Sequence, residues 1–400
     1  MKHYDLIIVG GGPIGLATAY QASLRGLKTL VLEQYSYLNN QGSSAGASRQ
    51  FRLQYAQTSM AELALAAQDY WASLQRFSQK SLITRSGSLW FGDPELNSQE
   101  GGIQAAENVM NALNIPYAPL NAAQIEAQYS FKNLPADYRG FFQPDGGIIN
   151  LKATENTLYN QALASGLVDL MEWQVVRAID ASTPDNIHIT TPNAEFCCSQ
   201  LAITTGPYIN QTLELLNLRM PIKLWQMSSA YFKKTAEQLY LPTWFVFQKP
   251  QQSALFYGFP EVDWSHPGYL RVATDFPDHG SIEKPSQRNI APSAKSLALD
   301  SNWVLKHMKG LQATPRFTST CLIALAQDST KELLLDYLPE DHPNHHNIVV
   351  YSAGWAGKFI PILGDMICQM LNKPTNDFHY RNYCIARSNF SINWQPSCQA

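Results

Sequence analysis

A group of glycines near the N-terminus has the spacing of a loop that holds phosphates. Gly10-Gly11-Gly12-Pro13-Ile14-Gly15 fits the pattern G-x-G-x-x-G. In such a loop the first glycine permits a tight turn, the second lets a pyrophosphate approach the backbone, and the third lets the helix pack closely on the strand. Backbone amides at the start of that helix then face the phosphates. Glu33 follows Gly15 by 18 residues (33 − 15) and can accept hydrogen bonds from both ribose hydroxyls.

The segments around these glycines complete a recognisable unit. Tyr4–Val9 and Lys28–Leu32 are rich in Ile, Leu and Val, which is typical of buried parallel strands. Ile14–Leu24 has an apolar helical pattern that ends at Gly26. Strand, glycine loop, helix, strand and acid in this order predict a dinucleotide-binding unit, the alternative being a glycine-rich turn in another α/β fold. The motif does not separate FAD from NAD, but an acid in the ribose position disfavours NADP because it would repel a 2′-phosphate.

Further elements must position these residues. Helical periodicity predicts helices at Met60–Leu74, Gly102–Leu113, Asn156–Ala164 and Ile362–Leu371. Apolar runs predict strands at Ser86–Phe91, Leu201–Thr204 and Asn347–Ser352. Residues 220–275 combine aromatic and β-branched residues with turn signals, which predicts an antiparallel sheet, and Phe276–Ser293 is expected to be a loop.

These elements predict an α/β protein with two domains. A doubly wound, Rossmann-like nucleotide-binding domain is expected from discontinuous segments at 1–82, 145–215 and 316–388. An α+β substrate domain with a mainly antiparallel sheet is expected at 83–144 and 216–315, and residues 389–400 are expected to form a C-terminal tail.

Composition narrows the class of protein. The 400 residues carry a net charge of −3, which argues against a nucleic-acid partner. No segment has the length and apolarity of a membrane span. The six cysteines form no C-x-x-C pair, which favours reduced thiols in the cytoplasm. The histidines at 342, 345 and 346 are expected in a solvated turn, so no metal site is predicted.

Residues 42–52, GSSAGASRQFR, resemble the second flavin-contact segment of the monomeric sarcosine oxidase family, FAD-dependent amine oxidases of the D-amino-acid-oxidase-like group. The motifs at 256–260, 320–321, 335–336 and 353–358 keep the family's order and approximate spacing. Within the family, Arg52-Leu53-Gln54-Tyr55, Asp275 and Trp355 resemble the branch of imino acid oxidases in nikkomycin biosynthesis, which convert piperideine-2-carboxylate into picolinate.

This resemblance implies FAD and a set of residues that hold it: Gly10, Gly12, Pro13, Ile14, Gly15, Glu33, Ser43, Ser44, Arg49, Val176, Gly206, Cys321, Gly354, Gly357 and Lys358. Cys321 matches the cysteine that forms a thioether to the flavin 8α-methyl. An ordinary buried thiol is the alternative for this residue. Arg49 matches an arginine beside the flavin ring, where a fixed positive charge stabilises the anionic reduced flavin; pairing with a phosphate or at the surface is its alternative.

The resemblance also implies a substrate site. Arg52 and Lys358 match positions that hold a substrate carboxylate, a task that suits the guanidinium fork and the compact ammonium. Two cations also lower the pKa of a substrate ammonium, which favours the neutral amine that can release hydride. Solvated helix-flanking charges are the alternative for both. Asp275 stands where sarcosine oxidases carry a histidine; it could accept a substrate N–H hydrogen bond or act as a general base, or be a turn aspartate.

Four further residues are expected at this site. Arg271 stands where sarcosine oxidases carry a lysine credited with activating dioxygen, so fast reaction with O₂ is in doubt. Trp355 could stack on a flat ring near the flavin, and Tyr257 could hydrogen-bond the ligand; core packing is the alternative for both. Glu100 is expected to reach the site from the second domain.

The resemblance therefore implies a monomeric enzyme that oxidises the C–N bond of a small cyclic imino acid or secondary amine carrying a carboxylate. Hydride would pass from the α-carbon to flavin N5, and O₂ would be reduced to H₂O₂. Three alternatives stay open. These are an oxidase of sarcosine, pipecolate or proline-type substrates, a flavin dehydrogenase with a protein acceptor, and a flavin- or NAD-binding protein without redox turnover.

Overall fold

One half of the molecule is built on a mixed sheet whose parallel centre is the predicted N-terminal unit. The computed structural model describes residues 2–98, 101–248 and 255–397. β1 (Lys2–Val9) pairs in parallel with β2 (Thr29–Leu32) on one side and with β14 (Glu195–Ile203) on the other, and α1 (Pro13–Leu24) connects β1 to β2. The four residues of β2 are buried, as their apolar run predicts.

This eight-stranded sheet is assembled from distant segments, as expected for a doubly wound domain. Its order is β11-β2-β1-β14-β13-β12. In addition, β23 pairs with the C-terminal end of β14, and β22 pairs with β23. The added strands are β11 (Val168–Met171), β12 (Ala178–Thr183), β13 (Asn186–Thr190), β22 (Leu334–Tyr337) and β23 (Ile348–Ser352).

Three helices cover one part of this sheet. α1 packs against α5 (Leu151–Ala164) and α8 (Ile360–Asn372), and α8 also packs on α2 (Thr58–Gln75). The approach of α8 to α1 requires glycine, because a Cβ on Gly364 would lie 2.4 Å from a backbone carbon of Ala17. The apolar faces of these helices contribute to one apolar cluster.

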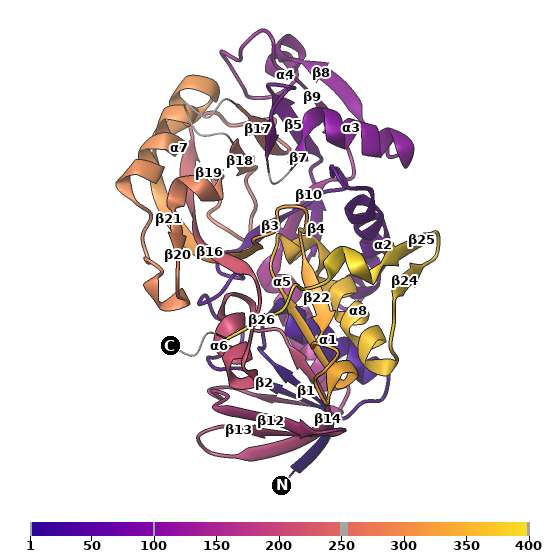
Figure 1. Cartoon of the computed structure of the whole chain (residues 1–400). Coiled ribbons are helices and arrows are strands. Elements are labelled where there is room, and N and C mark those ends of the chain that lie inside the picture. The colour runs from indigo at the N-terminus through magenta and orange to yellow at the C-terminus, as the bar shows by residue number, and fades with distance from the viewer. Residues whose placement is uncertain (1, 99–100, 249–254, 398–400) are drawn as a thin grey trace.

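The other half of the molecule, in the upper part of Figure 1, is a nine-stranded sheet with helices packed against it. Its order is β20-β16-β19-β18-β17-β5-β9-β8, and β21 pairs with β16. Every pair is antiparallel except β17 with β5. The strands are β5 (Ser88–Gly92), β8 (Ala118–Asn121), β9 (Arg139–Gln143), β16 (Ile222–Lys234), β17 (Thr243–Phe247), β18 (Leu255–Phe259), β19 (Tyr269–Thr274), β20 (Ser281–Ile282) and β21 (Leu311–Ala326), and the helices are α3 (Ile103–Ala112), α4 (Ala122–Gln128) and α7 (Ala294–His307).

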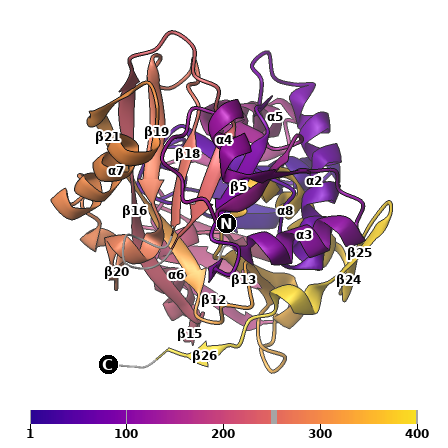
Figure 2. The same ribbon diagram turned by 90° about the horizontal axis from the view of Figure 1, so that it is seen from above.

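A small sheet lies between the two large ones. It consists of β3 (Ser48–Phe51), β10 (Gly147–Asn150) and β4 (Ile83–Arg85), with β10 in the centre. Figure 1 shows it between the upper and lower halves, and Figure 2 shows α7 and α2 on opposite sides of the molecule. Shorter elements complete the chain: β6 (Asn97–Ser98), β7 (Gly101–Gly102), α6 (Ile209–Leu213), β15 (Leu218–Arg219), β24 (Asp377–Tyr380), β25 (Tyr383–Ala386) and β26 (Gln395–Pro396).

The predicted fold class is confirmed, with differences at element ends. The helix predicted at Asn156–Ala164 begins at Leu151, because the Asn150 side chain accepts a hydrogen bond from the backbone N–H of Ala153 and caps it. The strand predicted at Leu201–Thr204 is the end of the longer β14. The predicted loop after Phe276 contains β20 and short 3₁₀ turns. β21 crosses the predicted boundary at residue 316, and the division into domains stays a prediction.

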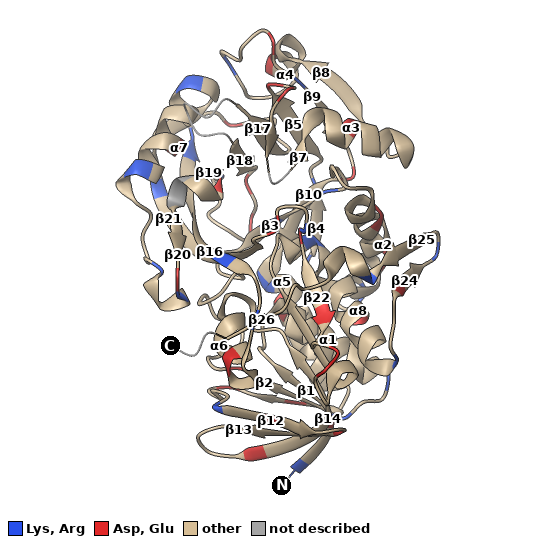
Figure 3. Ribbon diagram, viewed as in Figure 1, with Lys and Arg blue, Asp and Glu red and all other residues tan. Residues whose placement is uncertain are grey.

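Figure 3 shows acidic and basic residues spread over both halves, in keeping with the net charge of −3. Among the described residues no helix combines the length and apolarity that crossing a membrane requires. No metal-binding group of three His, Cys, Asp or Glu side chains occurs in the part of the chain that the structure describes.

Candidate active site

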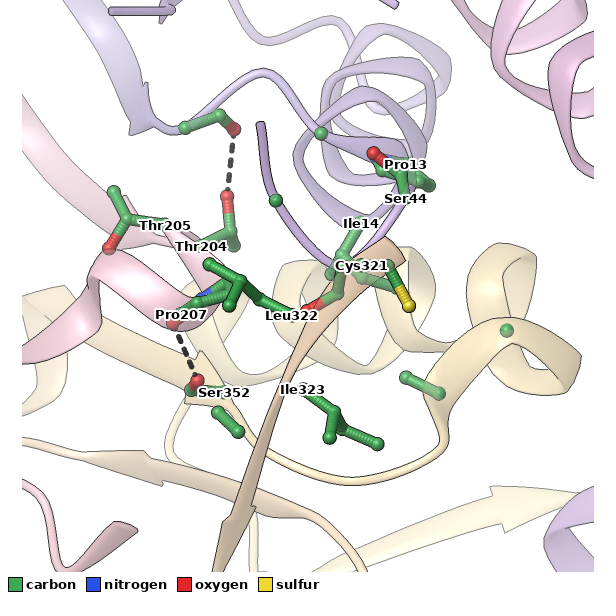
Figure 4. Close-up of a pocket in the computed structure, with 18 of the residues that line it drawn as sticks. Pro13, Ile14, Ser44, Thr204, Thr205, Pro207, Cys321, Leu322, Ile323 and Ser352 are labelled. Atoms are coloured by element: carbon green, nitrogen blue, oxygen red, sulfur yellow. Dashed lines mark hydrogen bonds between the residues drawn. The ribbon is translucent and has the colours of Figure 1, made fainter. Parts of the chain in front are cut away.

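A cavity of about 330 Å³ opens where the parallel sheet meets the nine-stranded sheet. Its walls come from the loops that follow β1, β2, β14 and β23, from β3, and from strands β18, β19 and β21 of the second sheet. Ligands of open α/β sheets bind at the carboxyl ends of the strands, which is where this cavity lies. Figure 4 shows residues of this wall, among them Pro13, Ser44, Cys321 and Ser352.

The glycine loop forms one end of the cavity, and its geometry explains the glycines. Gly10 has φ +103°, and a Cβ there would lie 2.8 Å from the Thr204 carbonyl oxygen. A Cβ on Gly15 would lie 1.9 Å from the Gly10 carbonyl oxygen, so α1 packs directly on the loop. Gly12 has open space where its Cβ would be. Gly10 and Gly12 line the cavity, whereas Gly15 contributes through packing and is absent from the lining.

The start of α1 faces this end of the cavity. Gly12 is the N-cap of α1, and no described side chain accepts a hydrogen bond from the first turn of the helix. Backbone N–H groups at a helix start lack partners within the helix and suit a phosphate. Pro13 at the first helical position has no N–H to satisfy.

Glu33 stands at the end of β2 and lines the same part of the cavity. Its carboxylate accepts hydrogen bonds from the backbone N–H of Gly11 (2.8 Å) and of Tyr35 (2.9 Å). Burial raises the pKa of Glu33, and these backbone bonds counteract the effect. Together with open Gly12 and the start of α1, this acid fits the pyrophosphate and ribose of a dinucleotide.

Arg49 on β3 organises the middle of the cavity. Its guanidinium donates hydrogen bonds to the carbonyl oxygens of Ser48 (2.7 Å) and Ala45 (2.8 Å), and also to that of Ser43. These bonds hold the 43–45 loop, in which Ser43 and Ser44 line the cavity. Burial lowers the pKa of Arg49, and the charge of Arg271 lowers it further.

Cys321 lies on β21, opposite Met227 of β16, and both residues line the cavity. It is a free, partly exposed thiol. Figure 4 shows its sulfur beside the cavity. The structure thus brings this cysteine, 311 residues after Gly10 (321 − 10), into one cavity with the glycine loop.

Two buried cations line the far end of the cavity. Arg52 is 1% exposed, and its Cζ lies 4.9 Å from the ring centre of Tyr55, 5.0 Å from that of Trp90 and 5.5 Å from that of Phe245. Lys358 is 4% exposed, and its Nζ lies 5.1 Å from the ring centre of Tyr55. The two cations therefore share an aromatic neighbour, which contradicts the alternative of solvated, helix-flanking charges.

Two residues of the nine-stranded sheet, Tyr257 and Arg271, face these buried cations. Tyr257 stacks on Phe245 with ring centres 5.4 Å apart, and burial raises its pKa to about 12. Arg271 is buried, and its Cζ lies 4.7 Å from the ring centre of Phe259. Both Tyr257 and Arg271 line the cavity.

Asp275 and Trp355 complete this end. Asp275 is buried, and its carboxylate accepts the backbone N–H of Phe276 (2.8 Å), so it caps a short 3₁₀ turn while lining the cavity. Trp355 follows two residues with positive φ, Ala353 and Gly354, and its ring centre lies 6.0 Å from that of Phe276. A Cβ on Gly354 would lie 1.7 Å from the Glu332 carbonyl oxygen, which explains a glycine at this sharp bend.

Most residues predicted for the site thus line one cavity, including Ile14, Val176, Gly206 and Gly357. Glu100 lies outside the described residues. Sequence reasoning did not find Gln50, Phe245, Phe259 and Met227, which also line the cavity. Gln50 and Phe259 lie within the segments at 42–52 and 256–260 that carry the family resemblance, whereas no pattern in the sequence indicated Phe245 or Met227.

Comparisons with known proteins agree with this geometry. The family model described as FAD dependent oxidoreductase (DAO) matches residues 5–370. The chain belongs to this family. It is 30% identical to a putative bifunctional amine oxidase of Dictyostelium discoideum over 97% of its own length, spanning 37% of that protein. It is 23% identical to a monomeric sarcosine oxidase of a Bacillus species, with 92% of each chain covered.

A solved structure extends the match to the whole fold. NikD, an unusual amino acid oxidase essential for nikkomycin biosynthesis, superposes with a TM-score of 0.89 at 32% identity, covering 98% of both chains. The predicted resemblance to sarcosine oxidases and to the nikkomycin enzyme is confirmed. The chain is therefore an FAD-dependent amine or amino acid oxidoreductase of the sarcosine oxidase and NikD type.

Proposed function

We propose that this oxidoreductase oxidises the C–N bond of a small cyclic imino acid or secondary amine that carries a carboxylate, a piperideine-2-carboxylate-like compound. The observation that carries the proposal is the pair of buried cations, Arg52 and Lys358, in the same cavity as the glycine loop. The match to NikD and to sarcosine oxidases supports it.

Arg52 and Lys358 would hold the substrate carboxylate. A guanidinium pairs with both carboxylate oxygens, and an ammonium adds a compact charge. The same positive charges lower the pKa of a substrate ammonium and favour the neutral amine. Tyr55, Trp90 and Phe245 surround Arg52, which is 1% exposed.

Asp275, Tyr257 and Trp355 would set the orientation of the ring. Asp275 can accept an N–H of the substrate and take up a proton when a second oxidation makes the ring aromatic. The Tyr257 hydroxyl stays protonated at neutral pH, because burial raises its pKa to about 12, and can donate to the ligand. Trp355 offers a flat face against which a planar ring can stack.

The chain's residues also fit the cofactor. When bound, FAD supplies a hydride acceptor at flavin N5 and delivers the electrons to O₂, which yields H₂O₂. The glycine loop and Glu33 would hold its pyrophosphate and ribose, and Arg49 would place a positive charge beside the ring. We also propose Cys321 as the site of covalent attachment, supported by its free thiol in the cavity wall. Retention of flavin on the protein after acid precipitation tests this, and full release of the yellow colour contradicts it.

The decisive experiment is an anaerobic screen. The purified yellow protein is mixed with small cyclic imino acids, N-methyl amino acids and proline-type amino acids, and the loss of flavin absorbance is recorded. Bleaching by a cyclic imino acid, followed by an aromatic product spectrum once air is admitted to reoxidise the flavin for the second two-electron step, supports the proposal. A nonaromatic imine product favours a sarcosine, pipecolate or proline-type oxidase, and the absence of bleaching with every carboxylate-bearing amine contradicts the proposal.

The electron acceptor, the oligomeric state and the cellular compartment are parts of the same proposal. Peroxide formed under air supports an oxidase, whereas bleaching without peroxide favours a dehydrogenase with a protein acceptor. We expect a monomer in the cytoplasm, and the five described cysteines, none of which is in a disulfide, are consistent with a reducing compartment. Light scattering of the purified protein measures its oligomeric state.

A further inference from the structure

Arg271 links the nine-stranded sheet to the small sheet beside the cavity. From β19 its Nε donates to Ser229 Oγ on β16 at 2.8 Å. Its Nη1 donates to the carbonyl oxygen of Ser48 on β3 at 3.0 Å and lies 3.2 Å from Ser48 Oγ. The residue is 8% exposed. These bonds, made by two nitrogens to two separate strands, hold the guanidinium in one orientation.

The Ser48 carbonyl is shared with a second arginine. Arg49 Nη1 donates to the same oxygen at 2.7 Å. Two guanidinium groups this close repel each other, so their common position depends on the oxygens that bind both. The remaining bonds of Arg49 go to the 43–45 loop. The placement of Arg49 at the cavity is therefore coupled through Ser48 to Arg271.

Arg271 also lies beside Tyr257 in the cavity wall. Its Cζ lies 6.0 Å from the Tyr257 ring centre, and both residues line the cavity.

We propose that Arg271 is a positioning residue that fixes Arg49 at the cavity, and that this role depends on the shape of its guanidinium rather than on its charge. A lysine at this position would keep the charge but present a single nitrogen, which cannot reproduce a fork directed at Ser229 and Ser48. The inference rests on the proposed function in that the cavity takes FAD and a carboxylate ligand.

The test compares Arg271→Lys with Arg271→Met in the flavin-loaded full-length protein. Benzoate is the probe, and its binding is read from the change in flavin absorbance. We expect both variants to weaken benzoate binding about tenfold or more, and by similar factors, because both lose hydrogen bonds of a charged group. Wild-type affinity in Arg271→Lys, with loss only in Arg271→Met, assigns the role to charge and overturns the proposal.

A second measurement does not depend on the identity of the substrate. The holoenzyme is reduced with dithionite, and its reoxidation by O₂ is followed. Similar slowing in Arg271→Lys and Arg271→Met supports the positioning role, whereas a wild-type rate in Arg271→Lys overturns it. If the wild-type protein fails to bind benzoate, the proposed carboxylate site fails, and the reoxidation rates still decide the role of Arg271.

Two neighbouring serines on β16, Ser229 and Ser228, allow a comparison of two variants in which Arg271 itself is unchanged. Ser229→Ala removes one acceptor of its guanidinium, whereas Ser228→Ala removes a hydroxyl that bonds Ser296 (2.7 Å). We expect Ser229→Ala to weaken benzoate binding several-fold and Ser228→Ala to leave it unchanged. Ser229→Ala should add little in the Arg271→Lys background, because partners in one network are not additive.

Equal effects of the two serine variants, or full additivity with Arg271→Lys, overturn the proposal. Flavin content and thermal unfolding are measured for each variant to confirm folding. If Arg271→Met does not fold, the serine pair and Arg271→Lys decide the outcome.

Discussion

Substituting Arg52 tests the part of the site on which substrate choice depends. Arg52→Met keeps an unbranched apolar side chain among Tyr55, Trp90 and Phe245 but removes the charge. The residue is 1% exposed, so a carboxylate bound to it is shielded from water. Losing one partner of a buried, hydrogen-bonded charge pair costs about 3 kcal/mol, which is roughly a 150-fold increase in the dissociation constant.

The assay uses two ligands of nearly equal shape. Benzoate and benzamide are titrated separately into the yellow protein, and flavin absorbance reports binding. The wild-type protein should prefer benzoate, and Arg52→Met should lose that preference through weaker benzoate binding alone. Arg52→Lys keeps the charge but loses the fork, so about a tenfold weakening is expected. Equal losses for both ligands would show that Arg52 acts through packing, and unchanged benzoate affinity would refute the carboxylate site.

Three further predictions concern cofactor binding and the stability of the surrounding fold. Gly15→Ala should yield protein with little bound flavin absorbance, because its Cβ would lie 1.9 Å from the Gly10 carbonyl oxygen; normal flavin content would contradict the packing argument. Asp365→Asn should lower the free energy of unfolding by about 1.5 kcal/mol in a urea titration, because the buried Asp365 carboxylate pairs with Arg25, which solvent still reaches; a change below about 0.5 kcal/mol would contradict this. Cys321→Ser should bind FAD but release all of it on acid precipitation, and flavin that stays with the precipitate would place the attachment elsewhere.

The glycine loop shows why part of the site could be predicted from neighbours in sequence. The turn at Gly10, the close approach at Gly15 and the acid at Glu33 are all consequences of one short strand-helix-strand unit. Their structural roles follow from backbone sterics within about thirty residues, and the structure agrees with each. The element ends were less accurate, as at α5, where the cap by Asn150 moved the start five residues earlier.

The cation cluster shows what local patterns could not provide. Arg52 and Lys358 were assigned to one site by resemblance to a family, since no local pattern relates residues that far apart. Nothing in the sequence indicated that Arg271 would bond Ser48, 223 residues away. Such a contact depends on how the nine-stranded sheet, which carries Arg271, packs beside the small sheet, which carries Ser48.

By itself, the sequence of this protein determined the βαβ unit, the apolar strands and the residue types available for catalysis, because backbone sterics and hydrophobic periodicity act between near neighbours. The tertiary structure alone decided that Arg49, Arg271 and Tyr257 meet at one wall of the cavity. A one-residue shift in register would turn every side chain of a strand to its other face. The directions of Arg271 and Tyr257 were therefore set by the pairing of β19 with β16 and β18, which is a property of the folded sheet.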